Sequence, residues 1–374
     1  MDIIGRGTVF AGEKGTDRQS CAFQNIAVLP SGRWVCGFRA APMKGGTVGQ
    51  HALVTWSDDE GATWSKPTRP FDPPAVDGKP GLFRAAHPTA LGDDDVLMTL
   101  CWVDHSDPSL PFFNEETEGL LDSRLFLSRS ADGGATWSLP ALVDTSPFNI
   151  PTPITGPVLL LPNGEWALQF ELNKPYYDTS VWRHSSVLMF SNDEGKSWPE
   201  HVIVSNDPAN RIFYWDQRPG VMRDGTLLDV FWTYDNATAT YLNIHARSSK
   251  DSGRTWSDLW DTGVPGQPAP PVSLPDGRYA LVYVDRTGLP TIKLRASSDR
   301  GRTWPDATEA TVYGSGAGSQ TTSKASMQDA WAEMGKFSVG LPATASLPNG
   351  DVLVLYYAGP ETDHTNVEWV RVRA

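Results

Sequence analysis

Short apolar runs recur along the chain, and tight turns rich in Pro, Gly, Asn or Asp separate them in pairs. A clear example is LLPNGEWALQF at 160–170, in which two apolar runs flank Pro-Asn-Gly. Such a pair of runs predicts a β-hairpin, because the turn residues reverse the chain between two strands. Six stretches have this form, at 28–38, 91–102, 160–170, 221–231, 274–284 and 347–357.

A second repeat, Ser-x-Asp-x-Gly-x-Thr/Ser-Trp, occurs five times. Its Asp can accept backbone N–H groups, its Gly supplies a position with positive φ, and its Trp can pack beneath the turn. We therefore expect a tight turn between two strands, with aspartates that are structural. The five copies, called box turns below, lie at 57–64, 130–137, 191–198, 249–256 and 297–304.

The two repeats together predict units of four short strands, since a third strand leads from each hairpin into a box turn. Such units are the blades of a β-propeller. Six hairpins predict an all-β, six-bladed propeller that uses residues 1–374 as a single domain. Five box turns fit six blades if the N-terminal strand, at about 6–11, joins the C-terminal blade at 339–373 and closes the ring. Only 326–336 is predicted to form a short helix.

Composition and charge narrow the class of protein. The chain is 40% hydrophobic and carries a net charge of -13 without basic runs, which argues against nucleic acid and anionic membrane surfaces as partners. Cys21, Cys36 and Cys101 have no CxxC spacing and are expected to be buried and free. No apolar stretch is long enough for a membrane span, and no signal peptide is visible at the start. A cytoplasmic location is therefore expected by default, with secretion left open.

The hairpin turns and the box turns belong to one face of the predicted propeller, so the other connections belong to the opposite face. Long connections on that opposite face would wall a pocket, and residues at the ends of the inner strands would line its floor. The long connections are 39–51, 103–123, 172–184 and 305–337.

The box turns and hairpins resemble the sialidase-like (BNR/Asp-box repeat) propeller families over essentially the whole chain. The resemblance implies a sialidase-superfamily glycoside hydrolase. In sialidases an arginine triad holds the substrate carboxylate, a Tyr activated by a Glu attacks the anomeric carbon, and an Asp is the general acid and base. The resemblance implies no cofactor and no metal, and a carbohydrate as the partner.

This sequence departs from the sialidase pattern at several positions. Gln24 stands where the first arginine is expected, His51 where the acid–base Asp is expected, and Trp232 where a further arginine is expected. No Tyr opens the last hairpin. Asp216 matches the spacing of a family Glu, nine residues before the turn glycine Gly225.

Polar and aromatic residues at the ends of the inner strands form the candidate site, because carboxylates can supply acid and base and aromatic faces can hold sugar rings. Asp216 is the first choice for a catalytic carboxylate. The catalytic candidates are Asp216, Asp104, Glu171, Asp285 and His51. The sugar-binding candidates are Arg218, Arg286, Arg84, Arg39, Gln24, His87, His105, Trp102, Trp215, Trp232, Tyr234 and Tyr356.

The leading hypothesis is an exo-α-sialidase-like hydrolase that acts on a terminal, possibly acidic, sugar with a pair of carboxylates. A polysaccharide lyase is the alternative, in which His51, His87, His105 or a Tyr takes a proton next to a uronate carboxylate. A non-catalytic glycan-binding propeller is the third. His87 and His105 could also form a metal site, although their spacing matches no ligand signature. The sugar, the stereochemical outcome and the oligomeric state stay open.

Overall fold

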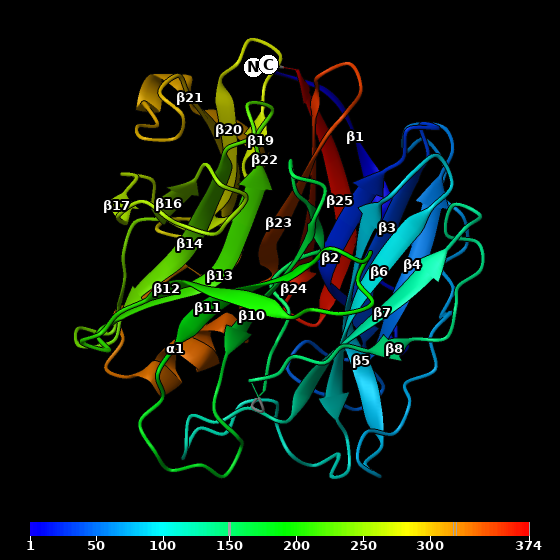
Figure 1. Cartoon of the computed structure of the whole chain (residues 1–374), viewed down its shortest axis with the longest axis vertical. Helices are drawn as coiled ribbons and strands as arrows, with labels where there is room; N and C mark the ends of the chain where they lie inside the picture. The colour runs from blue at the N-terminus through cyan, green and yellow to red at the C-terminus, as the bar shows by residue number, and fades with distance from the viewer. Residues whose placement is uncertain (149–150, 317, 319, 374) are drawn as a thin grey trace.

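The computed structural model describes residues 1–148, 151–316, 318 and 320–373. In this part of the chain the strands form five sheets, which build the all-β propeller shown in Figure 1. Four of the sheets are separate blades. The first contains β5 (Gly81–Ala90), β6 (Val96–Asp104), β7 (Ser123–Ser130) and β8 (Ala141–Leu142), and the second contains β9 (Leu159–Leu160), β10 (Trp166–Leu172), β11 (Ser185–Ser191) and β12 (Glu200–Asn206).

The other two separate blades have five strands each. The third contains β13 (Ile212–Val221), β14 (Leu227–Asp235), β15 (Thr240–Tyr241), β16 (His245–Ser249) and β17 (Trp260–Asp261). The fourth contains β18 (Gln267–Pro268), β19 (Val272–Ser273), β20 (Tyr279–Asp285), β21 (Thr291–Ser297) and β22 (Ala310–Gly314). A short 3-10 helix, Asp306–Thr308, lies between β21 and β22.

The remaining strands join in one seven-stranded sheet. They are β1 (Asp2–Phe10), β2 (Ser20–Val28), β3 (Trp34–Ala41), β4 (His51–Ser57), β23 (Val339–Ser346), β24 (Val352–Glu361) and β25 (His364–Arg373), in the order β23-β24-β25-β2-β3-β4 with β1 on β25. The antiparallel pairing of β1 with β25 runs from Asp2 opposite Arg373 to Phe10 opposite Val367. The two chain ends therefore lie side by side at the top of Figure 1.

The prediction of six separate blades in a closed ring is wrong. The first and last hairpins share the seven-stranded sheet, because β2 and β25 meet in parallel at Ser20 and Thr365. The Thr365 hydroxyl accepts the N–H of Cys21 at 2.8 Å and donates to the carbonyl oxygen of Cys21 at 2.7 Å. These bonds hold two strands together that are more than three hundred residues apart in the sequence.

The box turns have the predicted structure. In the first, Asp59 Oδ1 accepts the N–H of Thr63 at 2.8 Å, Asp59 Oδ2 accepts the Thr63 hydroxyl at 2.6 Å, and Ser57 Oγ accepts the N–H of Gly61 at 2.8 Å. The same bonds recur in the other four copies. Gly61 has φ 85°, and a Cβ there would lie 2.7 Å from the Trp34 ring. The box aspartates therefore fix turns.

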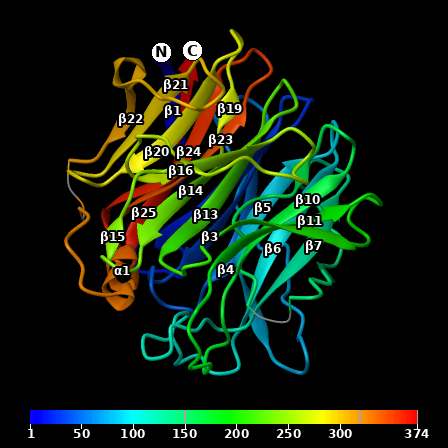
Figure 2. The same ribbon diagram turned by 60° about the vertical axis from the view of Figure 1, so that its left-hand side comes forward.

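The predicted helix is present as α1 (Met327–Met334), and the Ser326 side chain caps it by accepting the N–H of Asp329 at 3.2 Å. Its Trp331 ring stacks on Phe113, with ring centroids 4.3 Å apart. Figure 2 shows α1 at the same end of the molecule as β15. No described helix is long and apolar enough to cross a membrane. All three cysteines are buried and free, as predicted.

Candidate functional site

Four inner strands carry a β-bulge, at which an extra residue interrupts the pairing with the next strand. The bulges lie between Ala22 and Asn25 in β2, Phe83 and Ala85 in β5, Trp215 and Arg218 in β13, and Gly340 and Ala343 in β23. Three of them hold a non-glycine residue in the left-handed region, with φ 53° at Phe23, 50° at Asp216 and 47° at Leu341. Bulges re-aim side chains, and strained backbone of this kind concentrates at functional sites.

The bulge in β13 places the backbone of Asp216 against the carboxylate of Glu171. The N–H of Asp216 donates to Glu171 Oε1, which extends from the end of β10. The Asp216 side chain is 28% exposed and that of Glu171 is 12% exposed. Asp and Glu side chains in such neighbouring positions are the kind of groups that most glycosidases use.

A chain of polar contacts extends from Asp216 to the next blade. Gln267 Nε2 donates to Asp216 Oδ2 at 2.5 Å, and Gln267 Oε1 accepts from Arg286 Nη1 at 3.1 Å. On the other side, Arg218 Nη2 lies 3.4 Å from Asp216 Oδ1. We call Glu171, Asp216, Arg218, Gln267 and Arg286 the central cluster. Sequence reasoning missed Gln267, because it lies in the two-residue strand β18 outside any hairpin pattern.

His184 lies against the second carboxylate oxygen of Glu171. Its Nε2 lies 3.5 Å from Glu171 Oε2, and its side chain is 1% exposed. The imidazole packs between aromatic rings, at 5.8 Å from Phe213 and 5.8 Å from Trp182. In the part of the chain that the structure describes, neither ring nitrogen makes a well-aligned hydrogen bond. His184 is a further residue that the sequence pattern did not identify.

Several cations converge next to the central cluster. Lys44, from the connection between β3 and β4, donates from Nζ to Tyr357 Oη at 3.0 Å and to the carbonyl oxygen of Met334 at 2.9 Å. Burial lowers the pKa of Lys44 well below its usual value, and the charges of Arg286 and Arg39 act in the same direction. Burial, helped by the charge of Arg84, also lowers the pKa of Arg39 to about 9. Several basic side chains therefore lie close together in this region.

Arg84 is the cation of this group that has no polar partner among the described residues. Its guanidinium lies between two rings, 4.9 Å from the centroid of Phe23 and 4.3 Å from the centroid of Phe112. Burial lowers its pKa to about 10. The side chain is only partly covered, so its N–H groups remain available to an anionic ligand.

Comparison with known families identifies the fold. The sequence profile described as the BNR repeat-like domain matches residues 101–312, which is more than half of the chain. This chain belongs to that family. No curated protein sequence matches this chain.

Solved structures with the same fold include three that cover almost all of this BNR repeat-like chain. A protein of unknown function from Dyadobacter fermentans has 19% identity, a TM-score of 0.72 and coverage of 100% of this chain and 99% of its own. The Hadza microbial sialidase Hz136 has 15% identity, a TM-score of 0.66 and coverage of 98% and 68%. Trypanosoma rangeli sialidase has 13% identity, a TM-score of 0.64 and coverage of 98% and 59%. The predicted sialidase-like BNR-repeat propeller family is thus confirmed.

Gln24 stands at the position expected for the first family arginine. Its side chain bonds to the protein backbone. Its Nε2 donates to the carbonyl oxygen of Leu341, so it links the bulge of β2 to that of β23. Gln24 Oε1 is buried and accepts no hydrogen bond within the described residues.

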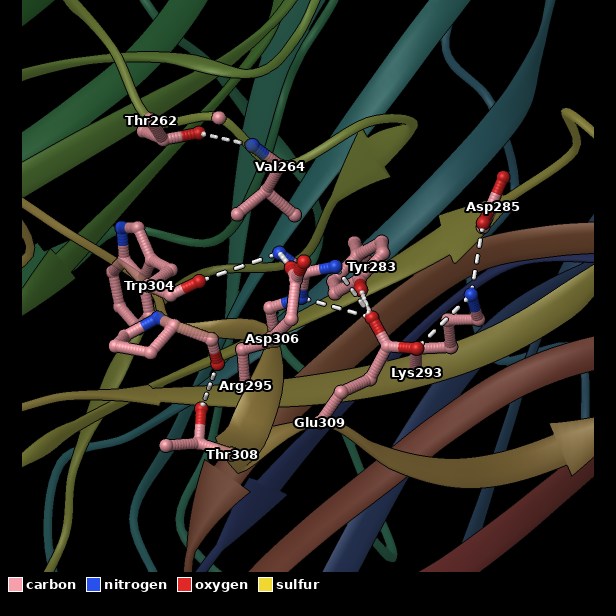
Figure 3. A network of polar contacts seen from close by, with 12 residues as sticks. Thr262, Val264, Tyr283, Asp285, Lys293, Arg295, Trp304, Asp306, Thr308 and Glu309 are labelled. Atoms are coloured by element: carbon pink, nitrogen blue, oxygen red, sulfur yellow. Dashed lines mark hydrogen bonds and ion pairs between the residues drawn. The ribbon is translucent and has the colours of Figure 1, made fainter.

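The other three catalytic candidates have polar partners other than Asp216 and Glu171. Asp104 pairs with Lys79 at 3.1 Å and lines an outer pocket. His51 Nδ1 lies 3.9 Å from the exposed Asp17, and burial lowers the pKa of His51. Asp285 pairs with Lys293 at 3.0 Å in the network of Figure 3. Of the five catalytic candidates, the structure brings only Asp216 and Glu171 into direct contact.

The same network gives Glu309 a strong effect on stability, and Glu309→Gln is expected to destabilise the fold most at neutral pH. Burial alone would raise the pKa of Glu309, but hydrogen bonds from Tyr283, Arg295 and Lys293 outweigh burial and lower it from 4.5 to about 2. A lowered carboxyl pKa stabilises the fold above pH 4.5, and this contribution is lost as the pH falls towards 2. Urea unfolding at pH 7 should give a free energy of unfolding about 1–3 kcal/mol lower for Glu309→Gln than for the wild type. This gap in the free energy of unfolding should shrink below pH 4.5. A difference that stays constant down to low pH would contradict this.

The aromatic candidates are buried in the blades. Trp102, Trp215, Trp232, Tyr234 and Tyr356 are at most 6% exposed. Trp102 donates from Nε1 to the carbonyl oxygen of Pro74 at 2.9 Å, and Trp215 stacks on Tyr234 with centroids 4.7 Å apart. These rings pack against protein, so a sugar could reach them only after neighbouring side chains move.

The two histidine candidates lie in different surroundings. His87 is buried, with Nδ1 3.2 Å from Asn25 Nδ2, and burial lowers its pKa to about 3. His105 is half-buried, and its backbone N–H donates to the carbonyl oxygen of Pro80 at 2.9 Å. Within the described ranges, no three His, Cys, Asp or Glu side chains are grouped so that they could hold a metal ion.

Proposed function

We propose that this BNR-repeat protein is a glycoside hydrolase that releases a terminal acidic sugar. The observation that carries the proposal is the central cluster, in which the Glu171 carboxylate meets Asp216 and in which Arg286 adjoins further basic side chains. Most glycosidases use two carboxylates at the scissile bond, one as acid and one as nucleophile or base.

The exposures of the two carboxylates support different roles. Asp216 is the more exposed, and Gln267 and Arg218 hold its two oxygens, so we assign Asp216 to the anomeric carbon as nucleophile or as the base that activates water. Glu171 lies deeper with His184 against its second oxygen, so we assign Glu171 to proton transfer at the leaving oxygen.

The cations support an acidic substrate. Arg84 has a guanidinium without a polar partner in the described chain, and the charges of Arg39, Lys44 and Arg286 add to the local field. Hydrogen bonds between a guanidinium and a carboxylate are roughly twice as strong as neutral ones. A sugar with a carboxylate is therefore the class of substrate that this surface favours.

The test is a panel of 4-nitrophenyl glycosides that contains a sialoside, a glucuronide and a galacturonide, each paired with an uncharged glycoside. We expect turnover of at least one acidic glycoside, with kcat/KM about a hundredfold above that of its uncharged partner. Absence of turnover on every acidic glycoside would refute the proposal. An unsaturated product that absorbs in the ultraviolet would show elimination and would also contradict hydrolysis.

A further inference from the structure

Gln267 stands between a cation and a carboxylate of the central cluster. Its Oε1 accepts a hydrogen bond from Arg286 Nη1 at 3.1 Å, and its Nε2 donates to Asp216 Oδ2 at 2.5 Å. The residue is 4% exposed, so both contacts are shielded from water. One side-chain amide therefore joins Arg286 to Asp216.

The backbone around Gln267 is held in place by its neighbours. Gln267 pairs with Val284 of β20, two residues before Arg286. Gly266 has φ 98°, and a Cβ there would lie 2.2 Å from the carbonyl oxygen of Val284, so only glycine allows this close approach. Pro268 restricts the chain on the other side. The amide is thus presented from the fourth blade to the bulge of β13 in the third.

Arg286 determines which way round this amide lies. A guanidinium has N–H donors and no acceptor, so the amide oxygen must be the atom that faces it. Other contacts keep Arg286 in place, because its Nη2 donates to the carbonyl oxygen of Val339 at 2.8 Å and its guanidinium lies 3.9 Å from the centroid of the Phe337 ring. The reverse orientation of the amide would set N–H groups against N–H groups at a buried site. The amide N–H of Gln267 therefore points at Asp216.

This orientation makes Asp216 Oδ2 an acceptor. The other oxygen, Oδ1, lies 3.4 Å from Arg218 Nη2, so each oxygen of Asp216 faces a donor. Hydrogen bonds to the ionised form of a carboxyl group favour that form. Hydrogen bonds in a chain also polarise one another, so the charge of Arg286 strengthens the bond that Gln267 donates.

The remaining titratable groups around Asp216 come from β10, β15 and β24. Glu171 on β10 accepts the backbone N–H of Asp216, and of these groups it is the one that opposes a negative charge there. Burial raises the pKa of Tyr357 to about 12 and that of Tyr241 well above its usual value, and the charge of Asp216 acts in the same direction on both. Both phenols are therefore neutral at physiological pH.

We propose that Gln267 is a positioning residue that transmits the charge of Arg286 to Asp216 and keeps Asp216 ionised, so that Asp216 and not Glu171 is the nucleophile or base. The division of roles between Asp216 and Glu171 rests on the proposed function. The effect of Gln267 on the ionisation of Asp216 does not.

Gln267→Glu tests the amide, because it keeps the shape and replaces the N–H donor with a carboxylate oxygen. One oxygen of the new side chain can accept from Arg286, and the other then faces Asp216 Oδ2. Two carboxylates so close together share a proton. In ¹³C NMR of the carboxyl carbons, Gln267→Glu should add a resonance that titrates near pH 6, about two pH units above an ordinary carboxyl group. Adding Asp216→Asn should remove this resonance.

Gln50→Glu is the matched control for the NMR measurement. Gln50 is also 4% exposed, and its Oε1 accepts from Arg39 Nε at 2.6 Å, but its Nε2 has no partner among the described residues. The same replacement there sets a carboxylate against an arginine without a second carboxylate, so no resonance should titrate near pH 6. The proposal is overturned if Gln267→Glu adds no such resonance, if the resonance survives Asp216→Asn, or if Gln50→Glu adds it too.

Gln267→Met provides a second measurement that adds no charge to the buried site. It removes the donor, so the pH midpoint at which the Asp216 carboxyl carbon titrates should rise by about one pH unit relative to the wild type. The Asp216 resonance is assigned by its loss in Asp216→Asn. An unchanged midpoint in Gln267→Met would also overturn the proposal, even if Gln267→Glu does not fold.

Kinetics on an acidic glycoside extend the test to the reaction. Activity that needs an ionised Asp216 is lost as the pH falls, so Gln267→Glu should move the low-pH limb of kcat/KM upward by about two pH units, which is about a hundredfold loss below that limb. A residue that only maintained the fold would lower kcat/KM equally at every pH, and that result would contradict the proposal. If no glycoside is turned over, the proposed function fails, while the NMR titrations still decide the role of Gln267.

Discussion

Replacing Asp216 with Asn is expected to lower kcat for the acidic glycoside by roughly a hundred- to ten-thousandfold while KM changes little. The amide cannot act as nucleophile or base, yet it has nearly the same shape as the carboxylate. Asn also tolerates positive φ, so the bulge at φ 50° should be kept. Steady-state kinetics on the glycoside that the panel identifies would measure the change.

Asp285→Asn is the matched control for this experiment. Asp285 is also a buried carboxylate at a strand end, directly before Arg286, but its oxygens bond to Lys293 and Thr287 and to no member of the central cluster. We expect Asp285→Asn to lower the melting temperature and to leave kcat close to that of the wild type. If both variants lose activity equally, or if Asp216→Asn retains full kcat, the assignment of Asp216 to the reaction is wrong.

The sequence was sufficient to predict the propeller because its signals are local. A hairpin turn such as Pro-Asn-Gly at 162–164 and a box turn such as 57–64 each specify their own geometry within a few residues. The blade count failed because the parallel contact of Ser20 with Thr365 joins distant segments, and no local pattern encodes that contact. Counting hairpins therefore overestimated the number of separate blades.

The site was harder to predict because bulges and loops build it. A bulge shifts the alternation of side chains, so spacing to a turn glycine could suggest Asp216 but could not show that Glu171 lies against its N–H. Lys44 enters from a connection whose sequence carries no catalytic motif. Trp102 looked available at a strand end, but the packing that covers it depends on distant residues such as Pro74.

Arg84→Met is expected to lower activity on acidic glycosides and at the same time to stabilise the fold. Burial lowers the pKa of Arg84 from 12.5 to about 10, so below pH 10 its charge costs stability, and a neutral side chain of similar length removes that cost. Loss of the contacts with Phe23 and Phe112 offsets part of this stabilisation. The net increase in the free energy of unfolding is expected to be about 1 kcal/mol. Chemical unfolding at neutral pH would measure it.

The loss of activity should depend on the charge of the substrate. Removing a guanidinium that bonds to a carboxylate should reduce kcat/KM for the acidic glycoside by about ten- to a hundredfold, and it should hardly affect the methyl ester of the same glycoside. Arg33→Met provides the contrast, because Arg33 pairs with the exposed Asp58 at 2.6 Å beside a box turn. That variant should leave both substrates unaffected. A residue that only maintained the fold would lower stability and slow both substrates alike, so the combination of higher stability with a charge-selective loss identifies Arg84 as a binding residue.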